Sequence, residues 1–209
     1  MRVDEGHGRT EYEHASPVVK IWGRDAVSRL GNLKSRVVLL PNNRLTLKVL
    51  SPKDVTEEYV SWLNDYEVVR FTEQKSAKQG KETVINFVNK QLHSNVDLLF
   101  GIFFDACHIG NIKLGPIDFS HKVSDISFFF GEKEMWGKGL MTEVIDTVVG
   151  IAFNDIGLDK VTAGAYANNI GSIRALEKNG FLVEGRRVKQ ILFEGERIDE
   201  VILGKLAQK

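Results

Sequence analysis

The chain has 209 residues, which is room for one domain or for one domain with an appendage. Hydrophobic residues make up 43% and charged residues 27%, values that exclude a disordered or low-complexity chain. Lys and Arg number 28, as do Asp and Glu, so the net charge is zero and we expect neither nucleic acid nor an anionic membrane as a partner.

Residues 1–40 are interpreted as an N-terminal extension of uncertain order, with a short helix expected around residues 25–33. This segment has no apolar signal-peptide core, and no run in the chain reaches the roughly 18 apolar residues of a membrane span. We therefore expect a soluble, cytoplasmic protein with one ordered domain over residues 41–209.

The hydrophobic periodicity predicts the remaining elements in chain order. Strand 44–50 leads to a helix that opens at Ser51, Pro52 and Asp54, which are a capping residue, a first-position proline and an acid at the positive helix end. The later elements are helix 81–93, strands 97–104, 109–117 and 123–130, helix 140–156, strand 161–167, helix 170–179 and a hairpin of 181–193 with 197–206. This order predicts one α/β (α+β) domain with a mixed sheet.

The loop between strand 123–130 and helix 140–156 carries the strongest chemical signal. Free backbone N–H groups and the helix dipole converge there, which is typical of a phosphate-binding loop, and Gly137 and Gly139 let the main chain approach an anion. The spacing excludes two known loops: five residues separate Gly131 from Gly137, unlike a Walker A motif, and Thr142 stands where a dinucleotide fingerprint has glycine. By itself, this loop is equally compatible with a plain tight turn.

A second segment follows downstream, with the sequence Asn-Asn-Ile-Gly-Ser-Ile-Arg-Ala-Leu-Glu-Lys-Asn-Gly-Phe over residues 168–181. Together the two segments resemble the GNAT superfamily of acetyl-CoA-dependent N-acetyltransferases, over residues 44–206. The Trp-Gly-Lys-Gly loop with its Thr-Glu helix is similar to the branch of ribosomal-protein N-terminal acetyltransferases. The whole tract of residues 110–134 looks more like relatives from surface-polysaccharide and amino-sugar gene sets. The resemblance implies a mainly antiparallel central sheet flanked by about four helices.

The resemblance also implies an acetyl-CoA site. Its pyrophosphate would meet the backbone N–H groups of Trp136, Gly137, Lys138, Gly139, Leu140 and Met141, with a hydroxyl from Thr142. The main chain of Phe128 and Phe130, together with Asn169 and Ser172, would flank the pantetheine arm. One departure stands out, because the Gln or Arg of the family loop is Glu134 here and brings an acid near a phosphate.

The catalytic roles that follow are transfers of protons and stabilisation of charge. Asp125 is the first candidate to accept the proton of the attacking amine, and Glu132 is the second. An N–H at Phe128 or Phe129 would stabilise the thioester oxyanion. Ser172 would protonate the thiolate, since the tyrosine that many family members use is Leu176 here. The alternatives are surface carboxylates for Asp125 and Glu132, a helix N-cap for Asn169 and a capping serine for Ser172.

We expect a small-molecule amine as the acceptor, chosen by the two early helices and the loop of residues 73–80. A nucleotide-linked amino-sugar is the first candidate, a protein N-terminus the second, and a polyamine or small antibiotic amine the third. Glu134 and Leu176 keep a non-catalytic acyl-CoA binding module open as an alternative. The lone Cys107 and the spacing of the histidines predict no metal site, and a homodimer is compatible with the family pattern.

Overall fold

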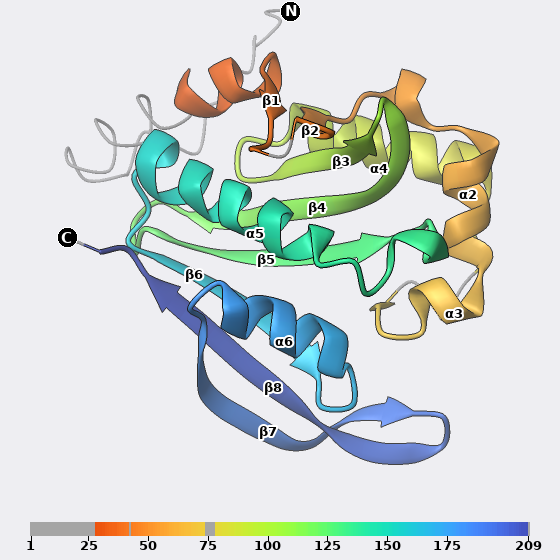
Figure 1. The fold of residues 1–209 in the computed structure, drawn as a ribbon, viewed down its shortest axis with the longest axis vertical. Helices are drawn as coiled ribbons and strands as arrows, with labels where there is room; N and C mark the ends of the chain where they lie inside the picture. Colours follow the sequence, from red (N-terminus) through yellow and green to blue (C-terminus); the bar gives the residue numbers. More distant parts are fainter. Residues whose placement is uncertain (1–27, 42, 74–77, 209) are drawn as a thin grey trace, which may run out of the picture.

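The computed structural model describes residues 28–41, 43–73 and 78–208. Their fold is a twisted eight-stranded sheet with helices on both faces (Figure 1). The order of the strands across the sheet is β1-β2-β3-β4-β5-β6-β8-β7, and each neighbouring pair is antiparallel except β5 and β6. The predicted α/β class with a mixed, mainly antiparallel sheet is thus confirmed.

The strands follow the predicted pattern closely. Their bounds are β1 Val37–Leu39, β2 Leu45–Val49, β3 Leu98–Phe104, β4 Cys107–Asp118, β5 Val123–Phe130, β6 Lys160–Tyr166, β7 Leu182–Phe193 and β8 Glu196–Leu206. The short β1, which pairs with β2, has no counterpart among the predicted elements. Three residues are too few for a period-2 pattern to be recognised in the sequence.

The helices are α2 Glu57–Asn64, α3 Tyr66–Val69, α4 Lys81–His93, α5 Leu140–Gly150 and α6 Ile170–Lys178. Helix α4 has the bounds that its amphipathic pattern predicts. The four-residue α3 was not expected; the Asp65 carboxylate caps it by accepting a hydrogen bond from the Glu67 N–H at 3.0 Å. Helix α5 ends earlier than predicted, because residues Ile151–Ile156 form a π-helical turn before Gly157 at φ +85°.

The helix predicted to open at Ser51 is wrong in one respect. Residues Pro52–Asp54 form only a 3₁₀ turn, because the Asp54 carboxylate bonds back to the Ser51 N–H and hydroxyl at 2.8 and 2.7 Å. The chain is extended at Val55, and α2 begins after Thr56, whose Oγ1 accepts the Tyr59 N–H at 3.1 Å. Thr56, rather than Ser51, is therefore the cap that starts this helix.

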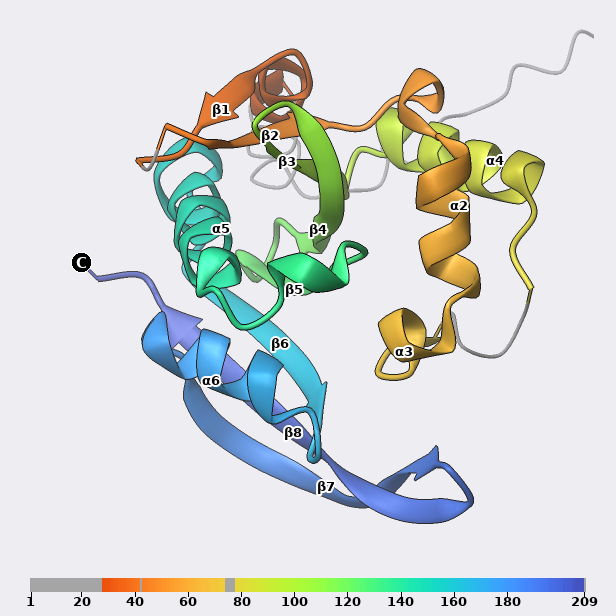
Figure 2. The same cartoon turned by 45° about the vertical axis from the view of Figure 1, so that its right-hand side comes forward.

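The chain has two hydrophobic cores, and the helices that cover them, α5 for one and α2 and α4 for the other, lie on opposite faces of the sheet (Figure 2). The larger core is packed under α5 and includes Val144, Ile145 and Val148. The smaller core is packed under α2 and α4 and includes Trp62 and Val88. Since strand side chains alternate between the faces, the same strands supply both cores.

Part of the expected N-terminal extension can be compared with the structure. Residues 28–34 are helical, and Leu30 and Leu33 are buried in the larger core together with Leu40. Residues 1–27 lie outside the described residues, so the predicted domain boundary at residue 40 stays a prediction. Among the described residues, no helix is long and apolar enough to span a membrane.

Candidate active site

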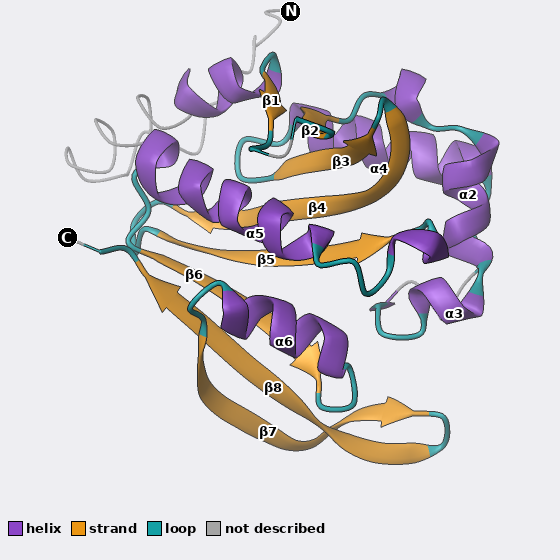
Figure 3. Ribbon diagram, viewed as in Figure 1, coloured by secondary structure: helices purple, strands orange, loops and turns teal. Residues whose placement is uncertain are grey.

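The sheet splits between its two parallel strands. Strands β5 and β6 pair only at Val123–Lys160, Ser124–Val161 and Asp125–Thr162, although β5 continues to Phe130 and β6 to Tyr166. Figure 3 shows the two strands running apart beyond this point. Asp125 and Thr162 are therefore the last paired residues before the split.

A cavity of about 880 Å³ occupies this split. From the face under α4 it is lined by Asp125 and Phe129, and from the face under α5 by Phe128, Ala165 and Leu176. Because side chains of both faces line one cavity, it passes through the sheet between β5 and β6. Such an opening admits two ligands from opposite faces, and its volume is within the ~300–1,000 Å³ range of small-molecule sites.

Asp125 lies at the closed end of the split and lines the cavity. Its Oδ1 accepts a hydrogen bond from the Thr162 hydroxyl at 2.9 Å. Burial raises the pKa of the Asp125 carboxyl, the bond from Thr162 and the charge of Lys113 oppose that rise, and Glu200 adds to it. A half-buried carboxylate with a raised pKa in a cavity is suited to accept a proton near neutral pH.

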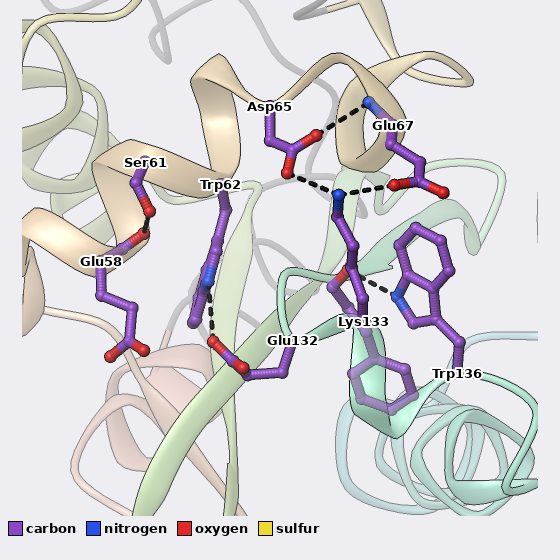
Figure 4. A network of polar contacts seen from close by, with 9 residues as sticks. Glu58, Ser61, Trp62, Asp65, Glu67, Glu132, Lys133 and Trp136 are labelled. Atoms are coloured by element: carbon purple, nitrogen blue, oxygen red, sulfur yellow. Dashed lines mark hydrogen bonds and ion pairs between the residues drawn. The ribbon is translucent and has the colours of Figure 1, made fainter.

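Glu132, the second candidate for this role, lies elsewhere. Its Oε1 accepts a hydrogen bond from the indole Nε1 of Trp62 at 3.0 Å (Figure 4), and it is not among the cavity-lining residues that the structure describes. Glu132 also stands close enough to Glu58 to contribute to the raised pKa of that carboxyl, after burial. The structure thus brings Asp125, and not Glu132, to the cavity.

The backbone of β5 presents alternate amides to the split. The Gly131 N–H donates a hydrogen bond of 2.9 Å to the carbonyl of Ile109 in β4. The register between β4 and β5 is unbroken from Phe130 back to Ile126. Alternation therefore directs the Phe129 N–H toward β4 and the N–H groups of Phe128 and Phe130 toward the split. The Phe130 carbonyl is also directed toward the split, because it accepts a hydrogen bond of 3.0 Å from the Trp136 indole N–H and not from β4. Of the two expected oxyanion donors, this geometry favours Phe128.

The loop before α5 contains two glycines in a left-handed conformation at the N-terminus of the helix. Gly137 and Gly139 have φ of +74° and +76°, a conformation that residues with a Cβ rarely adopt. Gly139 is the N-cap of α5 and offers no side chain, and a Cβ built on either glycine would meet no atom within 4 Å. The loop surface is therefore open at a helix N-terminus, where backbone N–H groups favour an anion.

The other residues expected at this loop are distributed around it. Lys138 is exposed, Leu140 and Met141 are half-buried against the larger core, and the Thr142 N–H turns back to the Gly139 carbonyl at 3.0 Å. Trp136 is 37% exposed. Glu134 is exposed on the 3₁₀ turn Lys133–Met135, one turn before the glycines.

Asn169 and Ser172 lie together at the start of α6 and both line the cavity. The Asn169 Oδ1 accepts the Ser172 N–H at 3.3 Å, so the N-cap that was the alternative for Asn169 is present. The cap leaves the Ser172 hydroxyl available to the cavity from the α5 face. Leu176, one turn further on, lines the same cavity and is 1% exposed.

Sequence reasoning missed several lining residues on the α4 face. The Tyr166 hydroxyl donates to Glu73 Oε1 at 3.0 Å, and burial first, then Glu73, raises its pKa to about 12. Glu200 lines the cavity beside them and is paired with Arg187 at 3.0 Å. Period 2 along β6 and β8 could have placed Tyr166 and Glu200 on one face, but the contact with Glu73 joins residues 93 positions apart. Residues 74–77 of the expected acceptor loop lie outside the described residues.

Within the described part of the chain, no group of three or more His, Cys, Asp and Glu side chains comes together as a metal site would require. The expectation of a metal-free site stays a prediction. His108 has structural contacts: its Nε2 lies 2.8 Å from Asn111 Oδ1, and its ring is stacked on Phe103.

Comparison with known proteins supplies a family context. The sequence model of the GNAT acetyltransferase domain matches residues 44–182. "Probable N-acetyltransferase YjcK" of Bacillus subtilis (strain 168) is 33% identical over 130 residues, which cover 61% of this chain and 72% of that protein.

Two solved structures share the fold. The ribosomal L7/L12 alpha-N-protein acetyltransferase RimL superposes with a TM-score of 0.75 at 12% identity, covering 82% of this chain and 98% of RimL. The spermidine N-acetyltransferase of Vibrio cholerae superposes with a TM-score of 0.71 at 21% identity, covering 79% of this chain and 96% of that one.

Proposed function

This chain belongs to the GNAT family of acetyl-CoA-dependent N-acetyltransferases, and from that premise we propose that it acetylates a primary amine held in the split-sheet cavity. The observation that carries the proposal is the passage through the sheet, lined from one face by Asp125 and from the other by Ser172. Two substrates that enter from opposite faces would meet without a covalent enzyme intermediate. Holding both in one geometry is itself a large source of rate.

Acetyl-CoA supplies the acetyl thioester, and the α5 face suits it. The open glycine loop from Gly137 to Gly139 would hold its pyrophosphate through backbone N–H groups at the α5 N-terminus. Phe128, Asn169 and Ser172 line the way from that loop to the split and would flank the pantetheine arm. The exposed position of Glu134 lets its carboxylate turn to solvent, so the acid there is compatible with phosphate binding.

The α4 face would take the acceptor. An amine is mostly protonated at neutral pH and must lose that proton before its nitrogen can form the new C–N bond. Asp125, with Oδ1 held by Thr162, would accept the proton directly or through one water molecule. Its raised pKa brings it closer to that of the amine, which favours the transfer.

Residues of β5 and α6 would stabilise the negative charge on the thioester oxygen and protonate the departing thiolate. The Phe128 N–H, directed into the split, would donate to the thioester oxygen as negative charge develops there. As the C–S bond breaks, the Ser172 hydroxyl would give its proton to the sulfur and recover one from solvent. Leu176, where the family tyrosine would be, supplies only an apolar wall.

For the acceptor we propose an amino-sugar, nucleotide-linked in its natural form. The resemblance of residues 110–134 to relatives from surface-polysaccharide and amino-sugar gene sets supports this, and the lining of the cavity is compatible with it. Its lining combines aromatic rings, such as Phe71, with the cationic Lys113 and Arg187 and the anionic Asp125 and Glu200. Rings that stack and charged groups of both signs suit a ligand that carries a base, a phosphate and an amine.

Two other acceptors have specific support. The likeness to RimL favours a protein N-terminus. The likeness to a spermidine N-acetyltransferase, solved with CoA and spermine, favours a polyamine. The carboxylates of Glu73 and Asp125 also favour it, since they line the cavity and accept hydrogen bonds from the neutral hydroxyls of Tyr166 and Thr162. The three proposed acceptors are therefore distinguished by the class of amine with which the enzyme turns over.

The test measures release of free thiol from acetyl-CoA against a panel of amines, with acetyl-CoA binding followed by calorimetry. The panel holds amino-sugar nucleotides, the matching N-acetylated sugars as blocked controls, N-terminal peptides and polyamines. We expect turnover with an amino-sugar nucleotide and none with its blocked control. Turnover confined to peptides or polyamines would replace the acceptor; binding without any turnover would favour the non-catalytic module; and absence of binding would contradict the cofactor site.

A further inference from the structure

The segment that joins β5 to the glycine loop is tied to the helices over the α4 face. We call residues 131–135 the connector and residues 57–73, which contain α2 and α3, the acceptor wall; the wall contributes Tyr59, Leu63 and Val69 to the cavity. The connector follows Phe130 directly and leads into Trp136 of the loop. It therefore contacts the two halves of the site in turn.

Three consecutive connector residues contact the acceptor wall, and Figure 4 shows the contacts of Glu132 and Lys133. Gly131 lies under Trp62 so closely that a Cβ would come within 1.9 Å of the indole ring. Glu132 accepts the Trp62 indole N–H at 3.0 Å. Lys133 reaches further along the wall, with Nζ at 2.8 Å from Asp65 Oδ2 and 2.6 Å from Glu67 Oε2.

Lys133 contacts the acceptor wall at the junction between α2 and α3. Asp65 ends α2 and caps α3, and its carbonyl accepts the N–H groups of Val68 and Val69, both at 3.1 Å. The hydrogen bond from Lys133 lowers the pKa of the Asp65 carboxyl, and the bonds to Asp65 and Glu67 raise the pKa of the Lys133 ammonium. Both shifts favour the charged forms of Asp65 and Lys133, so their ion pair is stable at neutral pH.

We propose that Lys133 is a positioning residue for the acceptor, which holds the acceptor wall in register with the acetyl-CoA loop. This inference rests on the proposed function. The contact stands outside the cavity, since Lys133 is absent from its described lining, and therefore acts through α3. Acetyl-CoA that orders the loop would also order the wall, and the two sites would be thermodynamically coupled.

A merely stabilising ion pair would behave differently. Exposed pairs contribute little to stability, and the side chains of Lys133 and Glu67 are 40% and 54% exposed. A comparable ion pair joins Glu57 of the wall to Lys81 of α4 at 2.7 Å. Its side chains are 79% and 47% exposed, and it does not involve the connector. Loss of either pair should have a similarly small effect on folding, so only the coupling separates them.

The experiment compares Lys133→Met, Lys133→Arg and Lys81→Met with the wild-type chain. Hydrogen exchange of the Glu67, Val68 and Val69 amides is measured with and without acetyl-CoA, and the acceptor KM is measured with the amine that the panel selects. We expect acetyl-CoA to slow exchange at α3 in the wild type and in Lys81→Met but not in Lys133→Met. We also expect Lys133→Met to raise the acceptor KM about 5- to 10-fold with the acetyl-CoA Kd within about 2-fold, a coupling of ordinary size. Lys133→Arg should restore both readouts.

Two results would overturn the inference. Equal protection of α3 by acetyl-CoA in all four proteins would show that the loop and the wall are not coupled through Lys133. An equal rise of the acceptor KM in Lys133→Met and Lys81→Met would show that the KM depends on the general rigidity of the acceptor wall and not on the contact with the acetyl-CoA loop. If the wild type binds no acetyl-CoA, the proposed function fails, and this inference with it; if it binds and α3 responds alike in every variant, only the inference fails.

Discussion

The two faces of the split sheet are built in different ways. On the α5 face, the groups assigned to acetyl-CoA come mainly from the glycine loop and the start of α6, two short local segments. On the α4 face, the site is built by contacts between distant parts of the chain, such as Tyr166 with Glu73 in the cavity and Trp62 with Glu132 outside it. The first face depends on backbone geometry and the second on side chains.

This difference bears on what each face can recognise. Backbone N–H groups and positive-φ glycines bind a phosphate whatever side chains surround them, which suits a cosubstrate shared by a whole family. A surface made of side chains from α2, α3, β6 and β8 can change its chemistry by substitution without disturbing the loop. We therefore expect changes on the α5 face to affect acetyl-CoA binding and changes on the α4 face to affect turnover and acceptor choice.

The largest effect is expected for Gly139→Val. A valine at φ +76° is strained, and its side chain would occupy the open space that we assign to the phosphate. Acetyl-CoA affinity, measured by calorimetry, should fall by about 100-fold or more, since several hydrogen bonds to a charged group are lost together.

The control for that change is Gly195→Val in the β7–β8 turn. Gly195 has φ +86° and likewise no atom within 4 Å of an added Cβ, so its strain is matched. Both variants should lose similar thermal stability, but Gly195→Val should keep its acetyl-CoA affinity. Unchanged affinity in Gly139→Val would contradict the assignment of the loop.

The groups that we assign to the α5 face are also the ones that the sequence indicates most directly. Gly137, Gly139 and Asn169 lie in motifs in which each residue's task follows from its neighbours, and α4, a locally amphipathic helix, was predicted with its observed bounds. Asp125 and Glu132 are ranked first and second by the family resemblance alone, because local pattern shows only an acid near the start of β5 and another just after its end. What separates them is the position of Trp62, 70 residues before Glu132, which no local pattern encodes.

The next largest effect is expected for Asp125→Asn. Asparagine keeps the shape and can still accept the Thr162 hydrogen bond, but it cannot take a proton from the amine. We expect kcat to fall by about 100-fold, within the range typical of a positioned general base, with acetyl-CoA affinity unchanged. The fall of activity toward low pH that Asp125 causes should also disappear. A normal rate at neutral pH would transfer the role to water or to another group.

A smaller, directional effect is expected for Thr162→Val. The Thr162 hydroxyl stabilises the charged form of Asp125, so its loss should raise the Asp125 pKa further. A base must be deprotonated to act, and the acid limb of the kcat/KM profile should therefore move to higher pH, with the plateau rate nearly unchanged. Thr147→Val, which removes a hydroxyl bonded to the Glu143 carbonyl on α5, should leave the limb in place. A shift to lower pH would contradict this role of Thr162.

The smallest effect is expected for Glu132→Gln, and it separates the two acids directly. Glutamine retains an oxygen to accept the Trp62 indole N–H, so the contact between the connector and the acceptor wall survives. It removes the negative charge beside Glu58, whose pKa should fall toward its ordinary value, as NMR titration would measure. If Glu132 only holds the wall, kcat and the acceptor KM stay within about 2-fold of wild type, far from the loss expected of a general base. A loss as large as that of Asp125→Asn would mean that Glu132 turns into the cavity during turnover and that the division of tasks between the two acids is reversed.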